Sequence, residues 1–244
     1  MELPKLNLHI HSKFSDGRNS ISQIVLTALD MGLDYICITD HFTNSWKADV
    51  IPNLNSLAKI EMYLDEIDQF QKYLLDEKRQ MALFKGIEID LSSTEKFIVN
   101  NILPTKFDIL LFEYLESIEG IFFIKKIINY WKGKTKNPTD FPLIGLAHFD
   151  PSFFAIDGMN ILIDFLTEYQ IFFEFNSSYP QFYSQKYRSF FDQLKERNVL
   201  VSVACDSHHL SNLKDIEEAY DRIKFYELES NLIDLVQILD KKRI

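Results

Sequence analysis

Two histidines near the start of the chain have a spacing that metal sites use. His9 and His11 end a run that alternates between apolar and polar residues, which is typical of a β-strand. Residues two apart on a strand point to the same face, so both imidazoles face one way. Asp16 follows in a Ser-Asp-Gly turn and adds a carboxylate. Imidazole and carboxylate groups bind divalent metals in proteins, so this stretch predicts part of a metal site.

All six histidines of the chain fall at the ends of expected strands. Asp206 and His208 repeat the spacing of two seen at the N-terminus. A single histidine at a strand end is usually an ordinary core or surface residue, but applying that reading to all of them requires a coincidence. Nine ligands are therefore predicted to converge: His9, His11, Asp16, His41, Glu88, Glu113, His148, Asp206 and His208. Nine exceed what one tetrahedral zinc needs and suit two or three divalent ions bridged by carboxylates.

The elements that must position these ligands alternate between strand and helix. Strands are expected at 5–10, 35–39, 82–87, 107–112, 142–147, 171–173 and 199–204, and helices at about 20–31, 55–79, 117–131, 159–169, 182–197 and 230–240. Seven strands without a domain-sized break predict one domain, residues 1–244, with a parallel sheet and its chemistry at the carboxyl ends of the strands. A closed or nearly closed barrel is favoured over an open doubly wound sheet, because an open sheet concentrates its site at one switch point.

The composition favours one packed core. The chain has 244 residues, of which 46% are hydrophobic, and this length is ordinary for a single α/β barrel. No apolar run suits a membrane span, and Met1 leads directly into a strand, so neither a membrane segment nor a signal peptide is expected. Cys37 and Cys205 are the only cysteines and favour a reduced, cytoplasmic protein. A net charge of −10 argues against a general nucleic-acid surface.

An ordered set of short motifs resembles the polymerase and histidinol phosphatase (PHP) superfamily of metal-dependent phosphoesterases. The motifs are His-Ile-His at 9–11, Ser-Asp-Gly at 15–17, Thr-Asp-His at 39–41, Gly-Ile-Glu at 86–88, His-Phe-Asp at 148–150, Glu-Phe-Asn at 174–176 and Asp-Ser-His at 206–208. The resemblance extends over almost the whole chain. It implies a distorted seven-stranded (β/α)7 TIM-like barrel with a trinuclear metal site, in a stand-alone phosphoesterase.

The same resemblance implies how the ligands divide among three metals. One metal would be held by His9, His11, Glu88 and Asp206, a second by His148 with Glu88 as a bridge, and a third by Asp16, His41 and His208. The departure is Glu113, because the family commonly has a histidine there. A carboxylate is a harder donor than imidazole, which favours Mn or Fe over Zn or weakens the second site.

The chemistry expected of this site is hydrolysis of a small phosphorylated metabolite. Two or three ions of Zn, Mn or Fe would activate a water and offset charge on the phosphate oxygens. The predicted catalytic residues are Asp40, which would orient ligands, Glu88 and Asp206. The predicted substrate contacts are Lys13, Arg18, Asn176 and Arg188. Aromatic residues at 149, 153, 154, 179, 182 and 183 are candidates for a pocket wall.

Several other functions stay open at this level. A histidinol-phosphate phosphatase is one specific form of the leading hypothesis. A phosphodiesterase or nuclease is a second alternative, against which the acidic charge argues. The Glu113 departure gives weight to a metal-binding module without turnover. Amidohydrolases also begin with a His-x-His strand, but they usually add a metal-bridging lysine, and Lys85 lies inside an expected strand rather than at its end.

Overall fold

The computed structural model describes residues 3–156 and 158–242, so the predicted domain 1–244 extends slightly beyond them. Within these residues the parallel sheet has the order β1-β2-β4-β5-β6-β7-β8, and a short β3 also pairs with β4. The strands are β1 (Leu6–Ile10), β2 (Tyr35–Ile38), β3 (His41–Phe42), β4 (Ala82–Asp90), β5 (Ile109–Glu113), β6 (Leu143–Leu146), β7 (Ile171–Asn176) and β8 (Val201–Ala204). The seven strands of the main path confirm the predicted fold class.

The barrel is nearly closed between its first and last strands. Ile10 and Ser207 form a parallel bridge just beyond β8. The His11 amide donates to the Ser207 carbonyl at 2.9 Å, and the Ser207 amide donates to the His9 carbonyl at 3.1 Å. This closure places the first strand, β1, beside the last strand, β8. The candidate ligands that follow these two strands are therefore neighbours.

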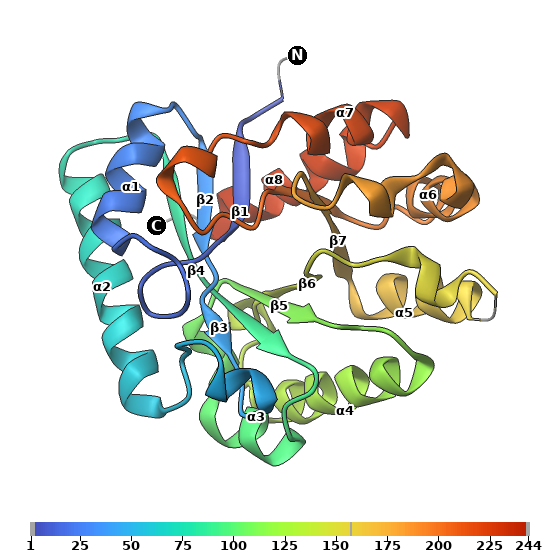
Figure 1. Ribbon diagram of the computed structural model, residues 1–244, viewed down its shortest axis with the longest axis horizontal. Coiled ribbons are helices and arrows are strands. Elements are labelled where there is room, and N and C mark those ends of the chain that lie inside the picture. The colour runs from blue at the N-terminus through green and yellow to red at the C-terminus, as the bar shows by residue number, and fades with distance from the viewer. Residues whose placement is uncertain (1–2, 157, 243–244) are drawn as a thin grey trace.

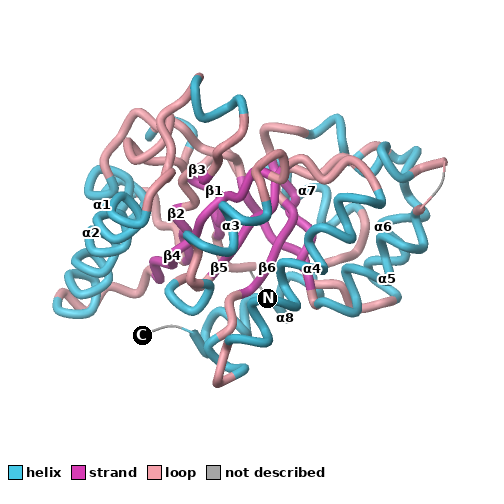
Figure 2. The backbone as a smooth tube through the Cα atoms, turned by 90° about the horizontal axis from the view of Figure 1, so that it is seen from below, coloured by secondary structure: helices cyan, strands magenta, loops and turns pink. Residues whose placement is uncertain are grey.

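Helices surround the sheet, with α1 and α2 on one side and α5 and α6 on the other (Figure 1; Figure 2). The helices are α1 (Ile21–Asp30), α2 (Leu57–Asp76), α3 (Glu95–Asn101), α4 (Ile118–Lys134), α5 (Met159–Tyr169), α6 (Arg188–Glu196), α7 (Glu217–Phe225) and α8 (Glu229–Lys242). All residues of β1, β2, β5, β7 and β8 are buried, as expected for parallel strands covered on both faces. Among the residues described, every helix is too short or too polar to cross a bilayer.

Local signals set several helix starts. Ser20 caps α1 in a capping box with Gln23, and serine side chains also cap α2 and α4 at Ser56 and Ser117. Each hydroxyl satisfies an amide that the first helical turn leaves without a partner. The expected helix at 182–197 begins only at Arg188, because two short 3₁₀ turns precede it. The sequence prediction also missed β3, α3 and α7.

Tyr63 on α2 stabilises the sheet where β2 ends. Its buried hydroxyl lies 2.7 Å from the Ile38 carbonyl and 2.8 Å from the Gly86 carbonyl. These carbonyls belong to neighbouring strands, and the β2 ladder stops at Ile38. The tyrosine hydroxyl thus hydrogen-bonds the backbone carbonyls at the place where the pairing of β2 with β4 ends.

We expect Tyr63→Phe to lower the free energy of unfolding by about 1–3 kcal/mol, because it leaves buried carbonyl groups without their donor. Urea denaturation followed by circular dichroism measures the change. Tyr73→Phe, at a half-buried position of the same helix, is the matched control. Equal stability of the two variants would contradict this role.

Candidate metal centre

The fold brings all nine predicted ligands to the carboxyl-terminal edge of the sheet. His9, His41, Glu88 and Glu113 lie in strands β1, β3, β4 and β5. The others are in the segments that directly follow β1, β6 and β8: His11, Asp16, His148, Asp206 and His208. Parallel strands end at the same edge, which is why residues far apart in sequence meet there.

Glu88 lies at the centre of this group. The side chain is fully buried, and neither carboxylate oxygen has a partner in hydrogen-bonding geometry. Four imidazole nitrogens nevertheless surround it, from His41 at 2.7 Å, His148 at 3.2 Å, His9 at 3.3 Å and His11 at 3.5 Å. Buried polar atoms are normally hydrogen-bonded. A carboxylate whose oxygens lack such bonds but face several nitrogen donors fits a bridging metal ligand.

A first group of ligand atoms joins β1 to the segment after β8. The Nε2 atoms of His9 and His11 are 3.0 Å apart. Asp206 Oδ1 lies 3.0 Å from His11 Nε2 and 3.5 Å from His9 Nε2. These three ligand atoms lie within 4.8 Å of one another. The donor set, two imidazoles and one carboxylate, is suited to a divalent transition metal.

A second group is centred on Asp16. Its Oδ1 atom is buried, has no hydrogen-bond partner, and lies 3.2 Å from His208 Nε2 and 3.7 Å from both His11 Nδ1 and His41 Nε2. Gly17 allows the loop to carry Asp16 this close to β1, because a Cβ atom there would lie 2.2 Å from the His11 carbonyl oxygen. The Ser-Asp-Gly turn thus places a carboxylate against three imidazoles.

The third group consists of His41, Glu88 and Glu113. Beside it lies Lys47, which the sequence prediction missed. Lys47 is buried, and its Nζ atom lies 2.9 and 2.8 Å from the two Glu113 oxygens. It also lies 3.3 Å from His41 Nδ1. No motif marks Lys47 in the sequence, because a lone lysine in a polar loop is normally a surface residue.

Buried carboxylates outside these groups hold the ligands in place. Glu174 on β7 lies 3.1 Å from His9 Nδ1 and accepts a hydrogen bond from the His148 amide at 2.9 Å. With Nδ1 donating to Glu174, His9 presents the Nε2 lone pair to a metal. Glu174 was part of a recognised motif but was not predicted as a site residue.

Asp40 supports the loop between His11 and Asp16. Its carboxylate accepts hydrogen bonds from the backbone and hydroxyl groups of Ser12 and Ser15. Asp40 is fully buried, and it is not among the residues lining the cavity described below. Its contacts are with the loop that carries Asp16, and its orienting role stays a prediction.

The charges of the cluster are strongly coupled. Burial lowers the pKa of His41, but Glu88 and Glu113 outweigh burial and raise it to about 10. Burial and the neighbouring His41 lower the pKa of His11 to about 4. Burial alone would raise the pKa of Glu88, yet His9 and His41 hold it well below its usual value. Without metal the centre therefore keeps ionised carboxylates beside protonated imidazoles. A metal that binds there would displace the protons from these imidazoles.

Two ligand-bearing segments have unusual backbone conformations. His148 has φ 32° and Asp206 has φ 50°, both in the left-handed region. Such conformations are uncommon for residues with a side chain and concentrate at functional sites. The Tyr179 hydroxyl fixes Asp206 further by donating to Oδ2 at 3.0 Å.

A cavity of about 460 Å³ opens beside the cluster. Its wall includes the ligands Asp16, His41, Glu113, His148, Asp206 and His208, together with Lys47 and the aromatic residues Tyr114, Phe149, Phe153, Tyr179 and Phe182. Four of the six predicted wall aromatics thus lie there. Phe154 and Tyr183 are instead fully buried in the core.

The predicted substrate contacts are not part of this wall. Lys13 and Arg18 are exposed on the loop after β1. Arg188 packs over Phe225 and pairs with Asp192 at 3.7 Å. Asn176 is buried and donates to Glu174 at 2.8 Å. Position near a strand end in the sequence did not specify the direction of these side chains.

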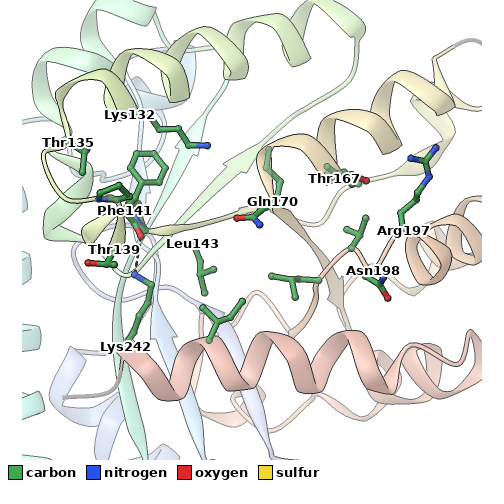
Figure 3. A pocket seen from close by; sticks show the side chains of 17 residues that line it. Lys132, Thr135, Thr139, Phe141, Leu143, Thr167, Gln170, Arg197, Asn198 and Lys242 are labelled. Atoms are coloured by element: carbon green, nitrogen blue, oxygen red, sulfur yellow. Dashed lines mark hydrogen bonds between the residues drawn. The ribbon is translucent and has the colours of Figure 1, made fainter.

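A second cavity, of about 780 Å³, lies at the other end of the barrel (Figure 3). It is lined by residues near the starts of β6 and β7, such as Leu143 and Ile171, and by the cationic residues Lys132, Arg197 and Lys242. It contains none of the predicted metal ligands. Its size alone therefore does not make it the reaction site, since chemistry in parallel barrels lies at the carboxyl ends of the strands.

Comparison with known families agrees with the sequence motifs. The model described as the PHP domain matches residues 7–236, nearly the entire chain. The chain belongs to the PHP domain family. A search of curated proteins found no match.

Solved PHP-like structures have the same fold. A histidinol phosphate phosphatase from Lactococcus lactis, complexed with zinc, L-histidinol and phosphate, is 18% identical, with a TM-score of 0.61 over 92% of this chain and 94% of that chain. A protein described as a histidinol phosphatase candidate from Listeria monocytogenes is 17% identical, with a TM-score of 0.60 over 89% and 99%.

A third similar structure is one of a pair described as metal-dependent tyrosine phosphatases, YwqE of Bacillus subtilis and CpsB of Streptococcus pneumoniae. It is 17% identical, with a TM-score of 0.58 over 98% of this chain and 95% of that chain. At these identities the similarity establishes the fold of this PHP protein.

We expect Glu174→Gln to weaken metal binding about 10–100-fold, because it removes the charge that orients His9 and raises its basicity. Competition with a chromogenic chelator measures the affinity. Glu168→Gln is the control, since Glu168 is an exposed residue on α5 that pairs with Lys125. Unchanged affinity in a folded Glu174 variant would rule out this orienting role.

Metal affinity should fall as the pH decreases from about 8 to about 6, a range that contains the ordinary histidine pKa. Protons compete with metals for the imidazoles, and the raised pKa of His41 extends this competition to neutral pH. The expected slope is about tenfold per pH unit for each proton displaced. Isothermal titration in two buffers of different ionisation enthalpy counts the protons, and pH-independent binding would contradict the prediction.

Proposed function

We propose that this PHP protein is a metal-dependent phosphatase that hydrolyses a phosphomonoester of a small metabolite. The observation that carries the proposal is the arrangement around Glu88. A buried carboxylate without hydrogen bonds faces four imidazole nitrogens, and further ligands line a cavity of about 460 Å³. The unpartnered oxygens of Glu88 and Asp16 fit divalent ions, for which we propose two or three of Zn, Mn or Fe.

Bound divalent ions would supply an activated water and positive charge for the phosphate oxygens. The residues of the chain hold this chemistry in place. His9, His11 and Asp206 would form one set of ligands, and Asp16, His41 and His208, with His11 beside them, would form another. Glu174 and Asp40 keep the first set and its loop oriented. Tyr179 donates a hydrogen bond to Asp206, and its ring lies 4.8 Å from the His148 ring on the wall of the cavity.

The cavity suits a small substrate rather than a nucleic-acid strand. Lys47 is the one Lys or Arg among its described lining residues, and Glu113 already pairs with it. Glu116 and Asp150 add negative charge to the wall. A phosphodiester polymer would meet repulsion here, since such binding needs several cations to neutralise phosphates. A leaving group that is aromatic or positively charged would be favoured by the aromatic and acidic wall.

The similar structures supply substrates for a direct test. Histidinol phosphate and a phosphotyrosine peptide correspond to the activities named for those proteins. We would assay both, with p-nitrophenyl phosphate and single-stranded DNA, after loading with Mn or Zn. Release of phosphate from a monoester supports the proposal, with histidinol phosphate favoured by its ring and positive charge. Cleavage of DNA alone would replace it with a nuclease function.

His9→Ala and Asp206→Ala should each reduce phosphate release at least about 100-fold, because each removes a ligand of the same group. Circular dichroism checks that both variants are folded. Lys13→Ala and Arg188→Ala are controls and should keep their turnover, since neither residue lines the cavity. Near-normal turnover in both ligand variants would overturn the proposed site.

A further inference from the structure

Lys47 occupies a place that the fold builds for it. It lies on the 3₁₀ turn Trp46–Asp49, which follows β3. Asp90, the last residue of β4, accepts hydrogen bonds from Thr43 at 2.7 Å and from Ser45 at 2.5 Å. The Ser45 hydroxyl in turn accepts the Lys47 amide at 3.2 Å. A buried aspartate therefore anchors the turn, and the lysine side chain is directed inward rather than into solvent.

The lysine ammonium contacts both oxygens of the Glu113 carboxylate, so a metal at this carboxylate would compete with a positive charge. Both Glu113 oxygens lie within 2.9 Å of Nζ. Glu113 is 1% exposed and Lys47 is 11% exposed by side chain, so water screens this pair weakly. Removing one partner of such a pair leaves an uncompensated buried charge, which is strongly unfavourable. The pair is therefore a persistent feature of the site.

Of the three ligand groups that the structure describes, one includes Glu113 and therefore has the Lys47 ammonium on one of its carboxylates. Among the residues that the structure describes, no lysine pairs with the carboxylates Asp206 and Asp16 of the other two groups, whereas the group of His41, Glu88 and Glu113 has the ammonium on Glu113. A divalent ion bound there would share Glu113 with a positive charge. The structure thus separates two groups available to metals from one that already holds a cation.

We propose that Lys47 acts as a built-in cation that occupies the Glu113 corner of the centre and limits it to two divalent ions. This inference rests on the proposed metal-dependent function, and it identifies Lys47 as a positioning residue. Because Lys47 also lines the cavity, its charge stays beside the substrate whatever the supply of metal. Glu88, whose carboxylate lies 2.7 Å from His41, would then be available to the two metal-binding groups.

The test measures metal per folded chain. The wild-type protein and its variants are loaded with excess Mn or, separately, Zn, desalted and measured by elemental analysis and native mass spectrometry. We expect two equivalents for the wild type. Lys47→Met should bind three, because it frees Glu113. The double variant Lys47→Met with Glu113→His should also bind three, and it avoids an unpaired buried carboxylate if the single variant folds poorly.

The matched control is Lys47→Met with Glu113→Gln, which removes the ammonium without leaving a good ligand and should stay at two equivalents. Three equivalents in the wild type would overturn the inference. So would two equivalents in the folded Glu113→His double variant. Hydrolysis of p-nitrophenyl phosphate is recorded separately. A wild type with two metals but no phosphoester turnover would overturn the proposed function and leave the role of Lys47 intact.

Discussion

The structure depends on a carboxylate that has no hydrogen-bond partner of its own. Glu88 is fully buried near the end of a central strand, where its oxygens face four histidine nitrogens from three segments of the chain. A buried charge without compensation costs far more than most single interactions contribute. In the absence of metal, protonated imidazoles compensate the negative charge of Glu88. Divalent ions would compensate this charge more fully. The surrounding architecture is arranged to bring those partners to one point.

Rigidity comes from carboxylates behind the ligands. Glu174 holds His9, Asp40 holds the loop before Asp16, and Asp90 holds the turn that carries Lys47. Each is at least 99% buried, so each hydrogen bond is protected from competition by water. These hydrogen bonds therefore fix the ligand positions without requiring a metal. Such preorganisation favours selective metal binding and correctly placed reacting groups.

The wall of the cavity is acidic and aromatic. Acidic residues such as Glu116 and Asp150 line the wall, and the one lysine there, Lys47, is already paired. The Tyr179 and Phe182 rings, stacked at 5.4 Å, give this wall an aromatic surface.

The sequence by itself predicted seven strands in a parallel sheet and named nine candidate ligands, which the structure brings to one edge of that sheet. Apolar runs ending in His or acidic residues specify which residues meet at the carboxyl edge, because strand direction and side-chain alternation are local properties. It did not predict Lys47 or Glu174 as site residues, and the predicted substrate contact Arg188 is not among the residues that line the cavity. The pairing of Lys47 with Glu113 joins residues 66 positions apart through a turn anchored on a third strand. Only the tertiary structure decided such contacts, since the direction of a loop side chain depends on the elements that pack around it.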